Sequence, residues 1–250
     1  MTAIIGCASV YRDEEFLRSS LDSYVNWVDS ALIFDGRYSG FPRLAPDRTG
    51  EIVHEVAARF DPMIYRPDYI GNRNSQKLIF LDTEAMHHTV CLDHGSEIVT
   101  DDSHTGHNLK EVANVELSET DKRNLFFRSI EPGNWAFIID GDEVCVGDVK
   151  LAFEEVKKSE QRVGWVFVEE QGNPGFKPRF LKVEKGMRYG QKHWEILDGA
   201  GKLITDSYWH AGDFALDSFK IYNFGYQRRS DRGKAHDEYR ETMRKKNWKE

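Results

Sequence analysis

The sequence is most constrained by a short apolar segment that runs into a series of carboxylates. Residues 135–139 read Trp-Ala-Phe-Ile-Ile, and this density of β-branched and aromatic side chains predicts a buried strand. The segment continues directly into Asp140, Gly141, Asp142 and Glu143, so three carboxylates would lie where a central strand leaves its sheet. In open α/β sheets, ligands bind in the crevice at this end of the strands.

The spacing of these carboxylates indicates a site for a divalent cation. Carboxylates this close repel one another, and a cation would relieve the repulsion. Asp140 and Asp142 are separated by one glycine and can aim at a single hard metal ion. A metal held by one or two carboxylates, with water and a substrate diphosphate completing its shell, is typical of Mg²⁺. The alternative is an acidic turn at the surface.

The N-terminal part of the chain alternates between apolar strands and amphipathic helices. Strands are predicted over 3–10, 31–34 and 63–65, and helices over 16–28 and 52–60. This order predicts a mostly parallel sheet flanked by helices. The expected fold class is therefore α/β, with a mixed, mostly parallel central sheet.

A helix is predicted over 119–127, with Ser118 and Asp121 in a loose capping box. It leads into the strand that ends in carboxylates, so Lys122 and Arg123 could reach the end of the sheet where Asp140 lies. Arginine reads phosphate oxygens bidentately. Alternatively, both cations are solvated charges on the helix.

The segment 87–117 interrupts the alternation. It contains five histidines without the tight spacing of a structural zinc motif: His87, His88, His94, His104 and His107. Alternating side chains over 89–92 and 97–99 favour a hairpin or loop inserted into the sheet's connections, and such an insertion often carries specificity.

Composition limits the class of protein. The chain has 250 residues and a formal net charge of −8, which argues against general binding to nucleic acid or to anionic membranes. Its three cysteines are widely spaced, as expected for reduced thiols in the cytoplasm. No signal peptide or membrane span is visible, although docking on a membrane to reach a lipid acceptor stays open. We expect one domain over 1–225 and a basic helical extension over 226–250.

Together these segments resemble the family-2-like glycosyltransferases with the GT-A fold, which transfer sugars from nucleotide-diphosphate donors. The likeness lies in five short motifs that span most of the chain: residues 8–17, residues 33–36 continuing to 47–49, residues 122–124, residues 135–143 and residues 178–195. The fourth, an aspartate-x-aspartate strand end, is the most specific. The resemblance implies one catalytic domain over 1–225, with its nucleotide-sugar half at 1–145 and its acceptor half at 146–225.

The resemblance implies roles for several residues on the donor side. The base of the nucleotide would be bordered by Ala8, Ser9 and Tyr11, and Asp35 would accept a hydrogen bond from base or ribose. Arg123 would lie beside the diphosphate. Asp140 would face the ribose and a Mn²⁺ or Mg²⁺ ion, Asp142 would ligate that ion, and the metal would neutralise the departing diphosphate.

The acceptor, a glycan, a lipid or a protein, would be approached from the other side. If the reaction inverts the anomeric centre, a carboxylate must deprotonate the acceptor hydroxyl. Glu195 is the candidate, with Glu143 as runner-up. His193 and Trp194 would lie in the same loop, either facing the acceptor or serving as structural residues.

The chain departs from the family's pattern in places. Arg12 stands where many relatives have Asn, and the stretch from Asp35 to Asp47 is long. Asn223 stands where relatives often carry a histidine ligand, and His210 is the nearest substitute for it. Two other classes remain: a nucleotidyltransferase, although residues 5–9 supply no Gly-rich basic phosphate loop, and a non-catalytic carbohydrate- or nucleotide-binding protein on the same fold.

Overall fold

The computed structural model describes residues 2–35, 41–42, 44–45, 47–60, 78–82, 90–91, 98–99, 119–190, 195–205, 213–227 and 230–247. The N-terminal elements are β1 (Ile4–Val10), α1 (Leu17–Tyr24), β2 (Ser30–Asp35), α2 (Thr49–Phe60), β3 (Leu78–Asp82), β4 (Val90–Cys91) and β5 (Ile98–Val99). The middle of the chain forms α4 (Glu119–Ser129), β6 (Trp135–Asp140), β7 (Glu143–Val146), α5 (Val149–Lys158), β8 (Val163–Glu170) and β9 (Gly175–Lys182). The last elements are β10 (Arg188–Tyr189), β11 (Ile196–Leu197), β12 (Leu203–Thr205), β13 (Phe214–Asn223), the 3-10 turn η2 (Gly225–Gln227) and α6 (Ser230–Asn247).

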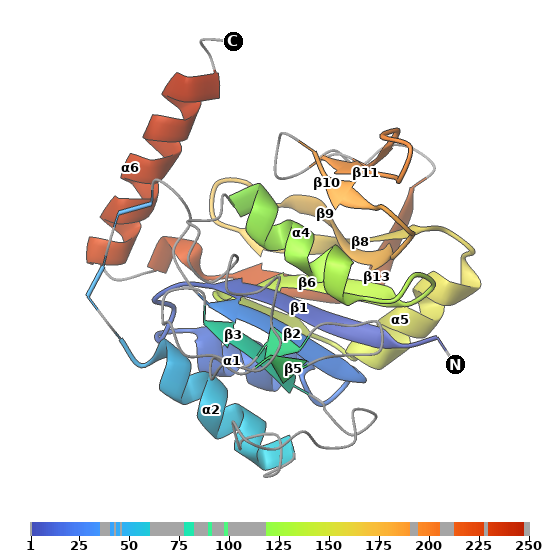
Figure 1. The fold of residues 1–250 in the computed structure, drawn as a ribbon, viewed down its shortest axis with the longest axis horizontal. Coiled ribbons are helices and arrows are strands. Elements are labelled where there is room, and N and C mark those ends of the chain that lie inside the picture. The colour runs from blue at the N-terminus through green and yellow to red at the C-terminus, as the bar shows by residue number, and fades with distance from the viewer. Residues whose placement is uncertain are drawn as a thin grey trace.

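An eight-stranded mixed sheet forms the centre of the molecule, in the order β3-β2-β1-β6-β9-β8-β13-β7 (Figure 1). The first four strands are mutually parallel, as the alternation of strands and helices predicts. Strand β9 runs antiparallel to both β6 and β8, and β7 runs antiparallel to β13. The predicted α/β class, with a mixed sheet of the GT-A type flanked by helices, is confirmed.

Helices cover both faces of this sheet. Strand β1 is buried throughout because its side chains alternate between two cores. Ile4 and Ala8 pack with α1 and α5, whereas Ile5 and Cys7 pack with α4 and the small β10-β11-β12 sheet. Figure 1 shows α4 on one side of the sheet and α1 and α2 on the other.

Strands β4 and β5 pair antiparallel, as predicted for a hairpin in the 87–117 segment, but its five histidines lie outside the described residues. The strand predicted over 63–65 and the cap Ser118 also lie outside them.

The last strand of the sheet ends within the apolar run over 221–226. Strand β13 ends at Asn223, and Gly225 begins η2. The Asn223 side chain ends the strand because its Oδ1 accepts the Gly225 N–H at 2.8 Å, which bends the backbone into a turn. The helix predicted in the C-terminal extension is present as α6. No helix in the described part of the chain is both long and apolar enough to cross a membrane.

Candidate functional site

The carboxyl ends of three parallel strands meet at one edge of the sheet and bring together residues far apart in sequence. Ser9 on β1 stands beside Asp140 on β6, and the next residue, Val10, stands beside Asp35 on β2. Tyr11 follows directly. Ser9, Tyr11 and Asp35 are each less than 10% exposed, so these polar groups form the floor of this edge rather than its solvent-facing rim.

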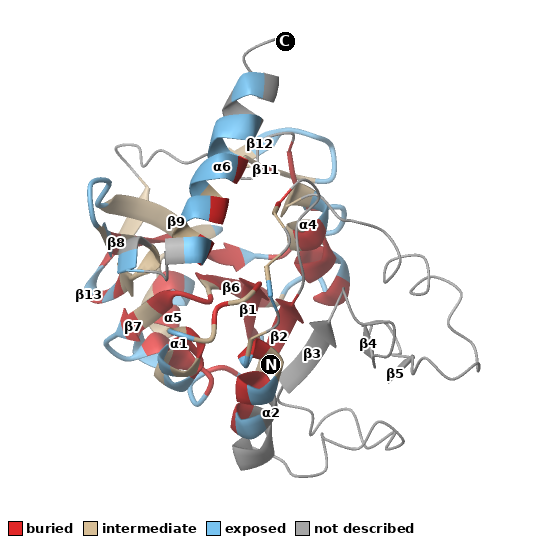
Figure 2. Cartoon of the chain, turned by 90° about the vertical axis from the view of Figure 1, so that its left-hand side faces the viewer, coloured by how far each residue is buried: buried red, intermediate tan, exposed pale blue. Residues whose placement is uncertain are grey.

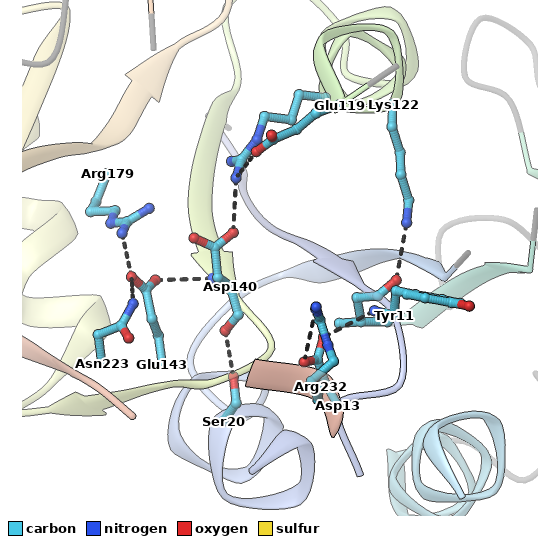
Figure 3. Close-up of polar contacts among 12 residues, drawn as sticks. Tyr11, Asp13, Ser20, Glu119, Lys122, Asp140, Glu143, Arg179, Asn223 and Arg232 are labelled. Atoms are coloured by element: carbon cyan, nitrogen blue, oxygen red, sulfur yellow. Dashed lines mark hydrogen bonds and ion pairs between the residues drawn. The ribbon is translucent and has the colours of Figure 1, made fainter. Parts of the chain in front are cut away.

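Asp140 is the more accessible of the two aspartates. Its side chain is 28% exposed, and its Oδ1 lies 3.1 Å from Nη2 of Arg123. The same guanidinium nitrogen lies 3.3 Å from Oε1 of Glu119, one turn earlier on α4. The Asp140 carbonyl also accepts a hydrogen bond from Ser20 Oγ at 3.2 Å (Figure 3). Helix α4 therefore places a cation directly on the first carboxylate of the turn.

Glu143 supports the turn from beneath. It is fully buried, and its Oε2 accepts the Asp140 N–H at 3.0 Å. Its Oε1 forms an ion pair with Arg179 of β9 and accepts from Asn223 Nδ2 at 3.3 Å. Burial raises the pKa of Glu143 to about 7, although the Arg179 guanidinium lowers it. Its oxygens thus hold the backbone of Asp140 in place.

Asp142 and Gly141 complete the turn. Asp142 is 2% exposed, and its carbonyl accepts the Phe224 N–H at 2.9 Å. Glycine is required at position 141 because neighbouring side chains pack closely against its backbone. A Cβ there would lie 2.8 Å from Val10 Cγ1 and 3.1 Å from Asp13 Oδ2. The turn is therefore pressed against the segment that follows β1.

Two residues at this edge are more deeply buried and make more hydrogen bonds than the sequence suggested. Asp13 is buried; its Oδ2 accepts the Tyr11 N–H at 2.9 Å, and its N–H donates to Thr49 Oγ1 at 2.8 Å. Lys122 is also fully buried, and its Nζ donates to the Val10 carbonyl at 3.0 Å. A signal for Asp13 was present, because it falls within the Tyr-Arg-Asp-Glu-Glu motif.

Glu195 lies immediately before β11, and its carbonyl accepts the Gly190 N–H at 2.8 Å. The neighbouring Tyr189 donates its N–H to Asn124 Oδ1 at 2.6 Å, and its ring lies 6.0 Å from the guanidinium of Arg123. Glu195 is thereby connected through the small sheet to the helix that contacts Asp140. His193, Trp194 and His210 lie outside the described residues.

The two aspartates of the turn are the candidate ligands for a hard divalent cation, which prefers carboxylate oxygens. Within the described ranges, no group of three or more His, Cys, Asp or Glu side chains could enclose a metal. Asp140 and Asp142 would therefore supply carboxylate oxygens only in part, and water and phosphate oxygens would complete the shell, as Mg²⁺ prefers.

No protein-family model matches the chain, and no curated protein sequence matches it significantly. Among solved structures, TarS of S. aureus matches 70% of this chain and 23% of its own, at 12% identity and a TM-score of 0.40. A second TarS structure, of residues 1–349, matches 70% of this chain and 38% of its own, at 12% identity and a TM-score of 0.38.

A putative glucose-1-phosphate thymidylyltransferase from Bacillus anthracis, in complex with a sucrose, matches 96% of this chain and 84% of its own, at 10% identity and a TM-score of 0.33. This chain thus spans well under half of either TarS chain. At such identities and TM-scores, none of these likenesses carries weight for its activity.

Proposed function

We propose that this chain is a metal-dependent glycosyltransferase that moves a sugar from a nucleoside-diphosphate donor to an acceptor hydroxyl. The observation that carries the proposal is the Asp140-Gly141-Asp142 turn, which leaves β6 beside the ends of β1 and β2 and holds Arg123 against its first carboxylate. An anionic ligand bound with a divalent cation is what carboxylates and a guanidinium at one strand edge can accommodate together.

The donor would lie across the ends of the parallel strands. Ser9, Tyr11 and Asp35 would contact the base and ribose, and Ala8, which is fully buried, would shape the floor beneath them. Asp140 and Asp142 would hold a Mn²⁺ or Mg²⁺ ion, which as a Lewis acid would neutralise charge on the departing diphosphate. Arg123 orients Asp140, and Glu143 fixes the backbone from which Asp140 projects.

The acceptor would approach from the small sheet. In an inverting course, Glu195 would take the proton of the acceptor hydroxyl while the hydroxyl oxygen attacks the anomeric carbon. The bond from that carbon to the diphosphate oxygen would break, and the nucleoside diphosphate would leave with the bonding electron pair. A carboxylate can serve this role where it is within hydrogen-bond reach of the acceptor.

The test is binding of the five common nucleoside diphosphates, with and without Mn²⁺, by calorimetry and thermal shift. A ligand that binds only the folded state raises its stability by mass action. We expect one diphosphate to bind in a Mn²⁺-dependent way, and Asp142→Asn to weaken this binding at least tenfold. Asp217→Asn is the matched control, because Asp217 is exposed on β13, six residues before Asn223.

The product of turnover separates the proposal from its rivals. Mn²⁺-dependent hydrolysis of the matching nucleotide sugar should release a nucleoside diphosphate. Release of pyrophosphate from a nucleoside triphosphate and a sugar phosphate would instead indicate nucleotidyl transfer. If no diphosphate binds wild type and Asp142→Asn changes nothing, the donor site is wrong and a non-catalytic role is favoured.

A further inference from the structure

Helix α6 buries one narrow face although most of its surface is polar. Arg232, Ala235 and Tyr239 are each at most 7% exposed, and their spacing of three and four residues places them on one side of the helix. They pack against Tyr11 and Phe41. Figure 2 shows the buried positions confined to one side of an otherwise exposed helix. The C-terminal helix is therefore docked on the residue that follows β1 at the candidate site.

The buried arginine of this face lacks the partners that a buried guanidinium needs. The Arg232 guanidinium lies 4.7 Å from the Phe41 ring centroid, and its Nη2 is 3.6 Å from Asp13 Oδ1, which is too long for a good hydrogen bond. Its Nε and Nη1 are buried with no acceptor in the described part of the chain. Leaving buried donors unsatisfied is destabilising, and most of all for a charged group.

Arg232 stands close to the aspartate turn. The carboxylate of Asp13, which faces the guanidinium through Oδ1, contacts the position of Gly141 through its Cβ and Oδ2. Figure 3 shows the guanidinium beside Asp13 and Tyr11, near the end of β1. The Asp13 side chain thus lies between the unsatisfied donors of Arg232 and the turn at which a diphosphate would be held.

We propose that Arg232 is a binding residue for the diphosphate of the donor, presented to the site by α6. This inference rests on the proposed function. The guanidinium fork matches a phosphate group, and it can donate through Nε and an Nη nitrogen at the same time. Asp13 would orient the fork, and the phosphate oxygens would satisfy Nε and Nη1. Ligand binding would then also fasten α6 to Tyr11 and Phe41.

The experiment compares Arg232→Gln and Arg232→Lys with wild type. The matched control is Arg240→Gln, an exposed arginine two turns later on the same helix. Calorimetry with Mn²⁺ uses the five nucleoside diphosphates, their nucleosides and inorganic pyrophosphate as ligands. Arg232→Gln should weaken the diphosphate that binds wild type, and pyrophosphate, at least tenfold, while affinity for the nucleoside stays unchanged. Arg232→Lys should recover part of the loss, and Arg240→Gln should bind as wild type does.

Two results would overturn the inference alone. Equal diphosphate affinity in wild type and Arg232→Gln would show that the guanidinium does not touch phosphate. Equal losses for nucleoside and diphosphate would show that Arg232 only docks the helix. If wild type binds no diphosphate while remaining folded by circular dichroism, the proposed function fails first, and the role of Arg232 fails with it.

Discussion

Glu143 shows what burial does to a carboxylic acid beside two others. Desolvation raises its pKa from 4.5 to about 7, and the charges of Asp140 and Asp142 act in the same direction. In the unfolded chain the group ionises at its ordinary value, so the folded protein binds more protons between about pH 4.5 and 7. Its contribution to stability is therefore complete below that window and is lost as the pH rises through it.

This predicts a specific difference between wild type and Glu143→Gln without added metal. Across that window, the free energy of unfolding of wild type should fall relative to the variant by at most about 1.4 kcal/mol per pH unit. Urea unfolding at intervals from pH 5 to 8 measures it. Parallel pH profiles for the two proteins would mean that the carboxyl is ionised throughout and that Arg179 outweighs burial.

The individual residues of the site were predictable to different degrees. Asp140 and Asp142 could be located because they end a strongly apolar strand, a signal contained in ten consecutive residues. The inward direction of the Glu143 side chain could not be predicted from the sequence, because its partners Arg179 and Asn223 come from other strands. The pairing of Arg232 with Asp13 joins segments more than 200 residues apart in the sequence, and no local pattern predicts it.

At the scale of elements, two glycines should respond to the same substitution with opposite signs. A Cβ at Gly6 of β1 would lie 2.5 Å from Cε2 of the buried Tyr24 on α1, so Gly6→Ala should force the helix and strand apart. Overpacking of this kind costs about 1–3 kcal/mol. Gly233 lies within α6 with nothing within 4 Å of a Cβ, so Gly233→Ala should stabilise that helix by roughly 0.5–1 kcal/mol.

Equilibrium urea unfolding checks the strand variant, and helicity by circular dichroism checks the helix variant. Little loss of stability in Gly6→Ala would mean that Tyr24 can move aside at no cost, in contradiction to its complete burial.

Local patterns predicted some elements and missed others. Strands β1, β2 and β6 and helices α1 and α2 follow from clear apolar periodicity. Helix α5 was missed although it carries signals: Asp148 caps it by accepting from the N–H groups of Lys150 and Leu151, and one apolar face is buried. The β10 and β11 strands are two residues long, too short to display a period.

For the molecule as a whole, the alternation of strands and helices was enough to predict the parallel half of the sheet. The other half depends on contacts between distant segments. Strand β9 inserts antiparallel between β6 and β8, and β13 carries Asn223 back to Glu143 on β7. The strand ends that carry Ser9, Asp35 and Asp140 were thus predictable from adjacent motifs, whereas the residues that support them come from strands placed only by tertiary packing.

The same contrast predicts that α6 opens independently of the sheet. Strands β1 and β6 are buried between two cores, whereas the described apolar side chains of α6 pack in the small cluster of Tyr11, Phe41, Ala235 and Tyr239. Segments with few buried apolar contacts open at lower free energy than the core. Hydrogen exchange in increasing denaturant should therefore show α6 exchanging well before β1 and β6.

Bound ligand should reduce this difference in hydrogen exchange between α6 and the sheet if Arg232 contacts phosphate. With Mn²⁺ and the diphosphate that binds, exchange in α6 should slow, because opening the helix would then also break the contacts of the guanidinium with the ligand. Exchange in α5, which packs against β13 and carries no residue of the candidate site, should stay unchanged and serves as the internal control. Slowing in α6 that persists in Arg232→Gln would assign the coupling to the Tyr11 and Phe41 contacts instead.

The ligand-free prediction has its own contradicting outcome. If α6 and β1 exchange at the same denaturant concentration without ligand, the helix unfolds together with the core, and its small buried cluster is stronger than its few residues suggest.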